Sequence, residues 1–196
     1  MARFPFGTTT GQVSRLRPNR AGGPIMVRGD TNQDAETPWP FIKACEEKFG
    51  PLTWDLAATK ANKKAPLWVP PETDSFTLNW HQLEPGLCFL NPPYAQITPW
   101  ARKCAEECQL GARILLLVPA SVGANWYWDW VVPFADVYSI GRVMFDNCYD
   151  RNGDLITKSY PKDLILCHYD WRVDGCLRTG FDNTKERGAI YRWRWQ

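Results

Sequence analysis

The 196-residue sequence lacks the features that mark several common classes of protein. It has no apolar run of about 20 residues that could cross a bilayer, and its N-terminus has no apolar segment of the signal-peptide kind. Its seven cysteines include no C-x-x-C pair, which argues against a zinc knuckle and a disulfide framework, so we expect small buried side chains. Only two histidines are present, with no Walker-type loop and no G-x-S-x-G motif. These absences predict a cytoplasmic protein without a metal site, a membrane partner or a hydrolase triad.

The composition that remains is that of one globular domain with a basic arm. Hydrophobic residues make up 44% of the chain, which excludes wholesale disorder, and 196 residues leave no room for two ordinary domains. Residues 1–35 show no apolar period and carry five arginines against two acids. We predict a flexible basic arm over 1–35, either a disordered tail or a phosphate-gripping segment, and a single domain over 36–196.

The apolar pattern of the domain predicts a β/α alternation. Thr37 is a good N-cap for a helix that Gly50-Pro51 ends. Unbroken apolar runs over 87–90 and 114–118 are typical of strands buried on both faces of a parallel sheet. Strands over 52–57 and 137–140, and helices over 98–110 and 125–132, complete the alternation. Beyond Gly141 we expect antiparallel additions around 163–169 and the final Trp193/Trp195 alternation. The predicted fold is α/β, a mixed, mostly parallel sheet with flanking helices and an antiparallel C-terminal hairpin.

Three segments follow predicted strands at the edge where an open α/β sheet binds its ligands. They are Asp55-Leu56-Ala57-Ala58, Asn91-Pro92-Pro93-Tyr94 and Pro119-Ala120-Ser121. Because parallel strands end at the same edge, we expect these segments to converge on one crevice.

The segment Asn91-Pro92-Pro93-Tyr94 carries the most specific chemistry. The exocyclic amine of a purine is a poor nucleophile because its lone pair is delocalised. The side-chain oxygen of Asn91 and the carbonyl of Pro92 would accept its two hydrogens and turn the lone pair toward an electrophile, while Tyr94 stacks on the base. Asn91 cannot accept a proton at neutral pH, so we expect alignment rather than general-base catalysis. A Pro-Pro pair that merely ends a strand is the structural alternative.

Several blocks in one order resemble the phage DNA N6-adenine methyltransferases, a Dam-like family, over about residues 37–145. The carriers are Thr37-Pro38 with Phe49-Gly50, Trp54-Asp55-Leu56-Ala57-Ala58 with Asn62, Asp74-Ser75-Phe76 with Trp80, Phe89-Leu90-Asn91-Pro92-Pro93-Tyr94 with Trp100, Val118-Pro119-Ala120-Ser121 with Trp126, and Gly141-Arg142-Val143 with Phe145. The resemblance implies a class I, Rossmann-like methyltransferase fold. It also implies S-adenosylmethionine as methyl donor, S-adenosylhomocysteine as product and adenine in DNA as acceptor, in a phage or prophage protein of a bacterial host.

The resemblance also implies roles for residues. Asn91, Pro92, Pro93 and Tyr94 correspond to the catalytic loop, and Phe145 would supply a second face for the base. The implied cofactor-binding residues are Thr37, Pro38, Trp39, Asp55, Leu56, Ala57, Asn62, Asp74, Ser75 and Asn91. Two departures stand out: no glycine-rich turn follows the first strand, and Asn91 replaces the Asp found in many adenine methyltransferases, which removes a charge.

An enzyme that acts on N6 of adenine in a duplex requires the target base to be flipped out, so the protein must also hold the DNA backbone. The basic arm is one candidate. Candidates within the domain are Lys60, Lys63, Lys64, Arg142, Arg172 and Arg178. As a set they predict salt-sensitive binding. Two other functions remain open: an RNA or protein-glutamine methyltransferase that uses the same loop, and a catalytically silent DNA-binding module. The sequence does not indicate an oligomeric state.

Overall fold

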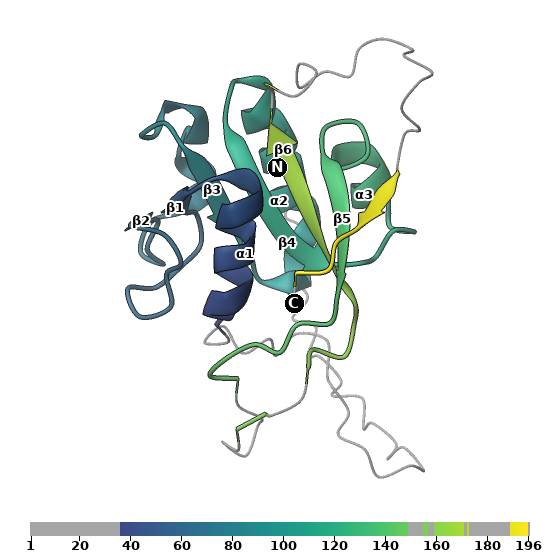
Figure 1. Ribbon diagram of the computed structural model, residues 1–196. Coiled ribbons are helices and arrows are strands. Elements are labelled where there is room, and N and C mark those ends of the chain that lie inside the picture. The colour runs from purple at the N-terminus through teal and green to yellow at the C-terminus, as the bar shows by residue number, and fades with distance from the viewer. Residues whose placement is uncertain (1–35, 149–154, 157–158, 171, 173–188, 196) are drawn as a thin grey trace, which may run out of the picture. The chain divides into compact units, whose positions relative to one another are not determined.

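One seven-stranded sheet forms the centre of the domain in the computed structural model (Figure 1), which describes residues 36–148, 155–156, 159–170, 172 and 189–195. Its strand order is β2-β1-β3-β4-β6-β5-β7. The strands are β1 (Leu52–Asp55), β2 (Leu67–Trp68), β3 (Leu87–Leu90), β4 (Arg113–Pro119), β5 (Asp136–Gly141), β6 (Leu164–Asp170) and β7 (Ile190–Arg192). Neighbouring strands run parallel except where β6 pairs with β4 and with β5. The predicted mostly parallel α/β sheet is therefore confirmed.

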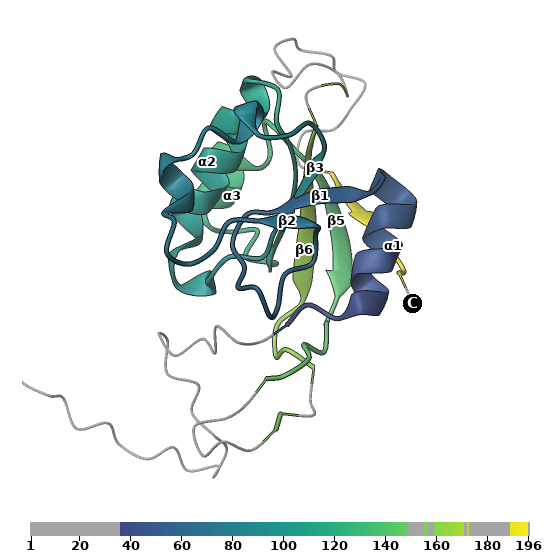
Figure 2. The ribbon, with the colours of Figure 1, turned by 90° about the vertical axis from the view of Figure 1, so that its left-hand side faces the viewer.

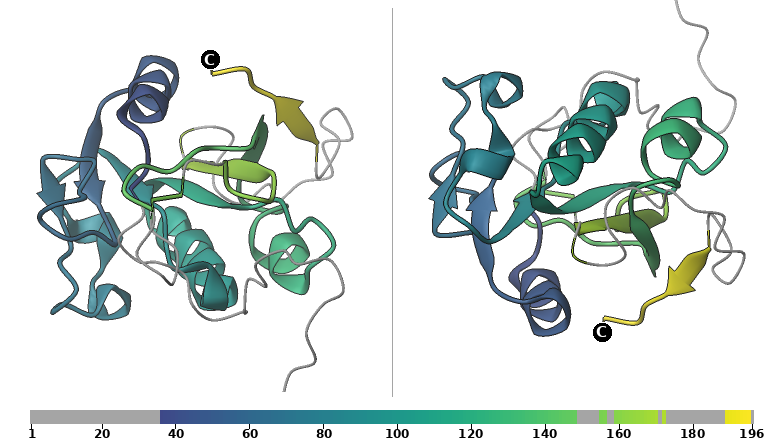
Figure 3. Two further views of the ribbon diagram at one scale, coloured as in Figure 1. Left: turned by 90° about the horizontal axis from the view of Figure 1, so that it is seen from below. Right: turned by 90° about the horizontal axis from the view of Figure 1, so that it is seen from above.

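Helices cover both faces of this sheet. α1 (Trp39–Phe49) lies on one face, and α2 (Ile97–Gln109) and α3 (Asn125–Trp130) lie on the other (Figures 2 and 3). Three short 3-10 helices, η1 (Ser75–Thr77), η2 (Trp80–Gln82) and η3 (Tyr94–Gln96), lie in the connections. None of the helices in the described ranges is long and apolar enough to cross a membrane.

The C-terminal part of the sheet differs from the predicted hairpin. β6 is antiparallel to β4 and β5, as expected, but β7 pairs with β5 in parallel. β6 runs opposite to β5, so the chain leaves β6 at the end of the sheet where β5 begins. β7 starts at that same end, and it therefore runs in the same direction as β5. The prediction of an antiparallel C-terminal hairpin is wrong for β7.

The start of α1 also differs from the prediction. Pro38, not Thr37, is the N-cap residue, and its carbonyl accepts hydrogen bonds from the N–H groups of Phe41 and Ile42. No side chain of the described residues caps this end of α1. At the other end Gly50 adopts φ 100°, and its N–H donates to the carbonyl of Glu46, as expected of a helix-ending glycine. The hydroxyl of Thr37 is therefore free of a capping role.

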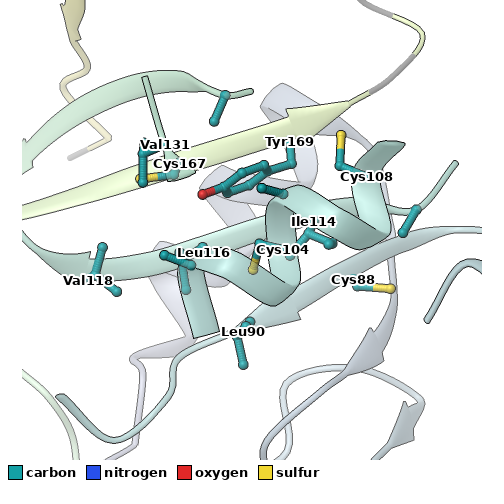
Figure 4. Close-up of a cluster of buried hydrophobic side chains, with 14 of the residues drawn as sticks. Cys88, Leu90, Cys104, Cys108, Ile114, Leu116, Val118, Val131, Cys167 and Tyr169 are labelled. Atoms are coloured by element: carbon teal, nitrogen blue, oxygen red, sulfur yellow. The ribbon is translucent and has the colours of Figure 1, made fainter. Parts of the chain in front are cut away.

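The core has two apolar layers because successive side chains of a strand point to opposite faces. Leu87 and Phe89 pack under α1, whereas Cys88 and Leu90 pack under α2. Figure 4 shows the α2 layer, in which Cys104 lies over β3 and β4. Burial raises the pKa of the Cys88 thiol to about 12, so this thiol stays protonated.

The cysteines follow the expectation in part. Cys45, Cys88, Cys104 and Cys167 are buried free thiols, and Cys148 is a half-buried one. Cys108 is buried too, but it is disulfide-bonded, which corrects the expectation for that residue.

Candidate active site

The predicted crevice lies at a topological switch point of the sheet. The chain passes from β1 outward to β2, then returns to the other side of β1 to form β3 and β4. The carboxyl ends of β1, β3 and β4 lie at one edge because these strands are parallel neighbours. Ligands of open α/β sheets bind outside such a point, so the loops after β1 and β3 form the candidate site.

The side chain of Asn91 is held from two sides. Its Nδ2 donates a hydrogen bond to Thr37 Oγ1 (3.1 Å), and its Oδ1 accepts one from the Tyr94 hydroxyl (2.9 Å). Thr37 is buried, and it comes from the segment before α1. Pro92 is buried and Pro93 is exposed. The catalytic-loop prediction thus corresponds to one ordered group at the end of β3 that also includes Thr37.

Two further aromatic residues, Tyr160 and Phe145, continue from the Tyr94 ring. Its ring meets that of Tyr160 edge-on at 5.5 Å between centroids, and Tyr160 meets Phe145 in the same way at 6.0 Å. Phe145 is buried and meets Tyr160 rather than Tyr94, so the aromatic neighbour of the Asn91–Tyr94 loop is Tyr160. Burial raises the pKa of Tyr94 well above its ordinary value, so its hydroxyl is a neutral donor.

Sequence reasoning missed Tyr160. It belongs to a proline-containing connection with no apolar period, and its backbone N–H donates to the Val143 carbonyl (2.8 Å), which holds it beside Phe145. No local sequence pattern predicts the contact of Tyr160 with Tyr94 and Phe145.

Asp55 organises the loop after β1. Its Oδ2 accepts the Lys64 backbone N–H (2.9 Å), and its Oδ1 accepts that of Ala57 (3.4 Å). Burial raises the pKa of this carboxyl to about 6, although the two backbone N–H groups and the nearby Lys64 ammonium oppose the rise. Asp55 is therefore a buried acid that ionises close to neutral pH.

Leu56 and Asn62, two other residues predicted to bind the cofactor, use their side chains in contacts within the protein. The Leu56 side chain is fully buried in the α2 layer, which leaves only its backbone for a ligand. Asn62 Oδ1 accepts bonds from the Thr59 N–H (2.7 Å) and hydroxyl (3.0 Å) and so closes a turn.

Lys64 lies against the segment before α1. Its ammonium is 3.1 Å from Glu36 Oε2 and 4.8 Å from the centre of the Trp39 ring, and the side chain is only 3% exposed. Trp39 is half exposed. The burial of Lys64 conflicts with the prediction that it contacts a DNA backbone, because its charge is already paired and shielded from solvent.

Asp74 and Ser75 form a separate group between β2 and β3. Asp74 caps η1 by accepting the Phe76 N–H (3.0 Å), and the Ser75 carbonyl accepts the indole N–H of Trp80 (3.0 Å). The Ser75 hydroxyl is buried and has no hydrogen-bond partner among the residues that the structure describes.

The remaining predicted DNA contacts lie on the surface where the structure describes them. Lys60 is exposed, whereas the Lys63 ammonium donates to the Pro66 carbonyl (2.9 Å) and lies 3.8 Å from the centre of the Trp68 ring. Arg142 is exposed near Asp163 (3.4 Å), and Arg172 is exposed and bonded to Asp170 (3.1 Å). Arg178 and the arm of residues 1–35 lie outside the described residues. No group of three or more potential metal-ligating side chains occurs in the described part of the chain.

A mostly parallel α/β sheet with an Asn-Pro-Pro-Tyr loop at its switch point is compatible with the methyltransferase class of folds. Comparison with known proteins identifies the family within this class. Residues 28–172, well over half of the chain, match the family described as DNA N-6-adenine-methyltransferase (Dam), and the chain belongs to this family. The resemblance to Dam-like proteins is confirmed.

A relative from a phage shares part of this sequence. A DNA N-6-adenine-methyltransferase of Escherichia phage T1 is 28% identical over 91 residues, which are 46% of this chain and 37% of the relative. The matched segment thus spans well under half of that relative's length.

Proposed function

We propose that this protein transfers a methyl group from S-adenosylmethionine to N6 of adenine in DNA, on a class I, Rossmann-like fold. The observation that carries the proposal is the Asn91 carboxamide, which ends β3 at the switch point and is oriented by Thr37. Membership of the Dam family and the phage relative support the same acceptor.

Asn91 and Pro92 would prepare the amine. The side-chain oxygen of Asn91 and the carbonyl of Pro92 accept the two N6 hydrogens and oppose delocalisation of the lone pair into the ring. As the N6–carbon bond forms, the bond between the methyl carbon and the donor's sulfur would break and leave S-adenosylhomocysteine, and the same two oxygens would stabilise the positive charge that develops on N6. The extra proton then leaves to solvent, because a neutral carboxamide does not act as a base at this pH.

Tyr94 would hold the flipped base. Stacking of a base on an aromatic ring contributes roughly 1–3 kcal/mol, and Tyr160 supports the Tyr94 ring from behind. Before the base enters, the Tyr94 hydroxyl occupies the Asn91 oxygen, so entry of the base must replace that hydrogen bond.

The residues around the crevice fit the proposed cofactor. S-adenosylmethionine supplies an electrophilic methyl group on a sulfonium centre, and it carries an ammonium, a carboxylate and an adenosine. The buried Asp55 carboxyl suits the ammonium, since a cation would compensate the cost of its ionisation. The unpartnered Ser75 hydroxyl suits a polar atom of the adenosine. Trp39, half exposed beside this edge, offers an aromatic face.

Methyl transfer from radiolabelled S-adenosylmethionine to adenine-containing DNA tests the proposal. Asn91→Ala should lower the rate by about 100-fold or more, as loss of one preorganised hydrogen-bonding group does elsewhere. Gln109→Ala, which removes an exposed carboxamide at the far end of α2, is the matched control and should retain the wild-type rate. Equal rates in Asn91→Ala and wild type would refute the mechanism.

The choice of acceptor tests the two alternative functions. Adenine-containing DNA should accept label, whereas RNA and glutamine-containing peptides should not. Preferential labelling of RNA or peptide would replace the proposed substrate. Calorimetry that finds no binding of S-adenosylmethionine at millimolar concentration would favour a silent DNA-binding module.

A further inference from the structure

The burial of Lys64 is unusual for a lysine and has a specific cause. Lysines are almost never fully buried unless they are paired, and the Lys64 ammonium has one carboxylate partner, Glu36 (3.1 Å), with the Trp39 ring beside it (4.8 Å). Its backbone N–H is anchored to the Asp55 carboxyl (2.9 Å). Lys64 therefore connects the end of β1 to the segment that precedes α1.

Glu36 is fixed from a third direction. Its Oε1 accepts a hydrogen bond from Asn147 Nδ2 (2.8 Å), and its backbone forms an isolated antiparallel bridge with Asp146 through two bonds of 2.8 Å. Partial burial opposes ionisation of Glu36, but the bonds from Asn147 and Lys64 outweigh it and lower the pKa. Glu36 is thus a charged residue held between two loops.

The residue after Glu36 is Thr37, whose hydroxyl accepts the bond from Asn91 Nδ2. The terminal torsion of an asparagine side chain is broad and roughly two-fold, so a carboxamide without this partner would turn away from one orientation. Together with the Tyr94 hydroxyl, which donates to Oδ1, Thr37 fixes where the Asn91 oxygen points, and only the Thr37 bond remains when a base replaces the hydroxyl.

We propose that the Glu36–Lys64 ion pair positions Thr37 against Asn91, and that Glu36 and Lys64 are positioning residues for the methyl transfer. This inference rests on the proposed function. Stability alone is a poor explanation of the pair, because replacing a buried ion pair with apolar groups of similar size is often neutral or stabilising. Orientation of a group on which the reaction depends is an explanation that the contacts support.

The test uses Glu36→Gln, Lys64→Met and the double variant. The double variant removes both partners, so neither Glu36 nor Lys64 is left as the unpaired half of the ion pair, and we expect it to fold even if a single variant does not. We expect kcat to fall about 10- to 100-fold in the double variant, with KM for DNA nearly unchanged, because misplacement of a reacting group by about 1 Å has an effect of that size. Lys64→Arg should recover part of kcat.

The control is a pair of the same charges on the surface. Arg102 and Glu106 of α2 form an exposed ion pair (2.7 Å), and Arg102→Met with Glu106→Gln should leave kcat unchanged. A double Glu36/Lys64 variant that is folded by urea unfolding and has a kcat within about twofold of wild type would overturn the inference, since an effect that small is under 0.5 kcal/mol.

A measurement independent of activity separates this inference from the proposed function. Amide hydrogen exchange of peptides covering 36–41 and 143–148 should be faster in the Glu36/Lys64 double variant than in wild type and in the surface control. Unchanged exchange would overturn the positioning role. A wild-type protein that methylates no DNA would instead refute the proposed function, and the exchange result would still decide whether the ion pair holds Thr37.

Discussion

Tyr94 has two competing uses for its side chain, since its ring is proposed to stack on a base while its hydroxyl occupies the Asn91 oxygen (2.9 Å). Tyr94→Phe keeps the ring and frees that oxygen. We expect Tyr94→Phe to keep kcat within about fivefold, because a single exchanged hydrogen bond contributes only about 1 kcal/mol net, and to bind DNA at least as tightly as wild type. Steady-state methyl transfer and DNA titration measure both quantities.

Removal of the Tyr94 ring should lower activity, unlike removal of its hydroxyl alone. Tyr94→Ala loses the stacking face, and kcat/KM should fall about 10- to 100-fold, in line with roughly 1–3 kcal/mol per stacked base. Tyr191→Ala, an exposed tyrosine on β7, is the matched control with no expected change. If Tyr94→Phe were as inactive as Tyr94→Ala, the hydroxyl would have a direct role in the reaction, and the competition described above would be wrong.

Asp55 should make the stability of the protein depend on pH. Its carboxyl titrates at about 6 in the folded protein instead of 3.8, so between these values the folded state binds more protons than the unfolded state. The contribution of Asp55 to the free energy of unfolding should therefore be largest below pH 3.8. This contribution should be lost as the pH rises through about 6.

Asp55→Asn removes that titration and keeps one acceptor oxygen. Measured by urea unfolding, its stability relative to wild type should rise by about 2 to 3 kcal/mol from pH 4 to pH 7. Asp129→Asn, at an exposed position on α3, should show no such trend. If the difference in stability between Asp55→Asn and wild type stayed constant from pH 4 to pH 7, the raised pKa of Asp55 would be wrong.

Between elements, the contact of β1 with Gly86, the residue before β3, leaves no room for a side chain. A Cβ on Gly86 would lie 1.8 Å from Thr53 Oγ1, at a point where the register between β1 and β3 is irregular. Gly86→Ala should therefore destabilise the protein by about 1–3 kcal/mol, as overpacking of a filled site does. Chemical denaturation checks this value.

Gly123 provides the control for Gly86, because a Cβ there would meet nothing within 4 Å. Gly123→Ala should change stability by less than about 0.5 kcal/mol. Thr53→Gly removes the contacting atoms, so adding Gly86→Ala to it should cost little more. Equal stability of Gly86→Ala and wild type would show that β1 and β3 separate easily.

Elements with a strong local pattern were predictable from the sequence. The run 87–90 is a strand as predicted, and the helix expected over 98–110 is shifted by one residue, because burial on both faces and a helical apolar stripe each leave a clear pattern. β2 was not predicted, since two residues between prolines carry no period. Thr37 is a residue type that is common at N-caps, but the helix begins one residue later, with Pro38 as its N-cap. The Thr37 hydroxyl accepts a hydrogen bond from Asn91 instead.

At the scale of the whole molecule, the site is assembled from segments far apart in the chain, which explains what sequence patterns could not show. The loop Asn91–Tyr94 could be proposed as catalytic from the sequence because its Asn, Pro and Tyr residues are adjacent in the chain. The Glu36–Asn147 and Asn91–Thr37 contacts join residues 111 and 54 positions apart, and no local period records such pairs. The pairing of Lys64 with Glu36, 28 positions away, was missed for the same reason, because a lysine in a loop resembles a surface charge until its partner is known.

The distribution of paired and unpaired charges over the molecule leads to a final test, which contrasts Lys60 with Lys64. Lys60 is exposed, so if it contacts a phosphate, Lys60→Gln should reduce the slope of log K for DNA binding against log salt by about 0.9, one released counterion. Lys64 has its charge buried against Glu36, so Lys64→Met should leave that slope unchanged even where it lowers kcat. DNA titrations between about 50 and 200 mM salt measure the slopes. Equal losses of slope in the two variants would mean that Lys64 leaves Glu36 for the DNA backbone, whereas no loss in either would place the phosphate contacts elsewhere on the protein.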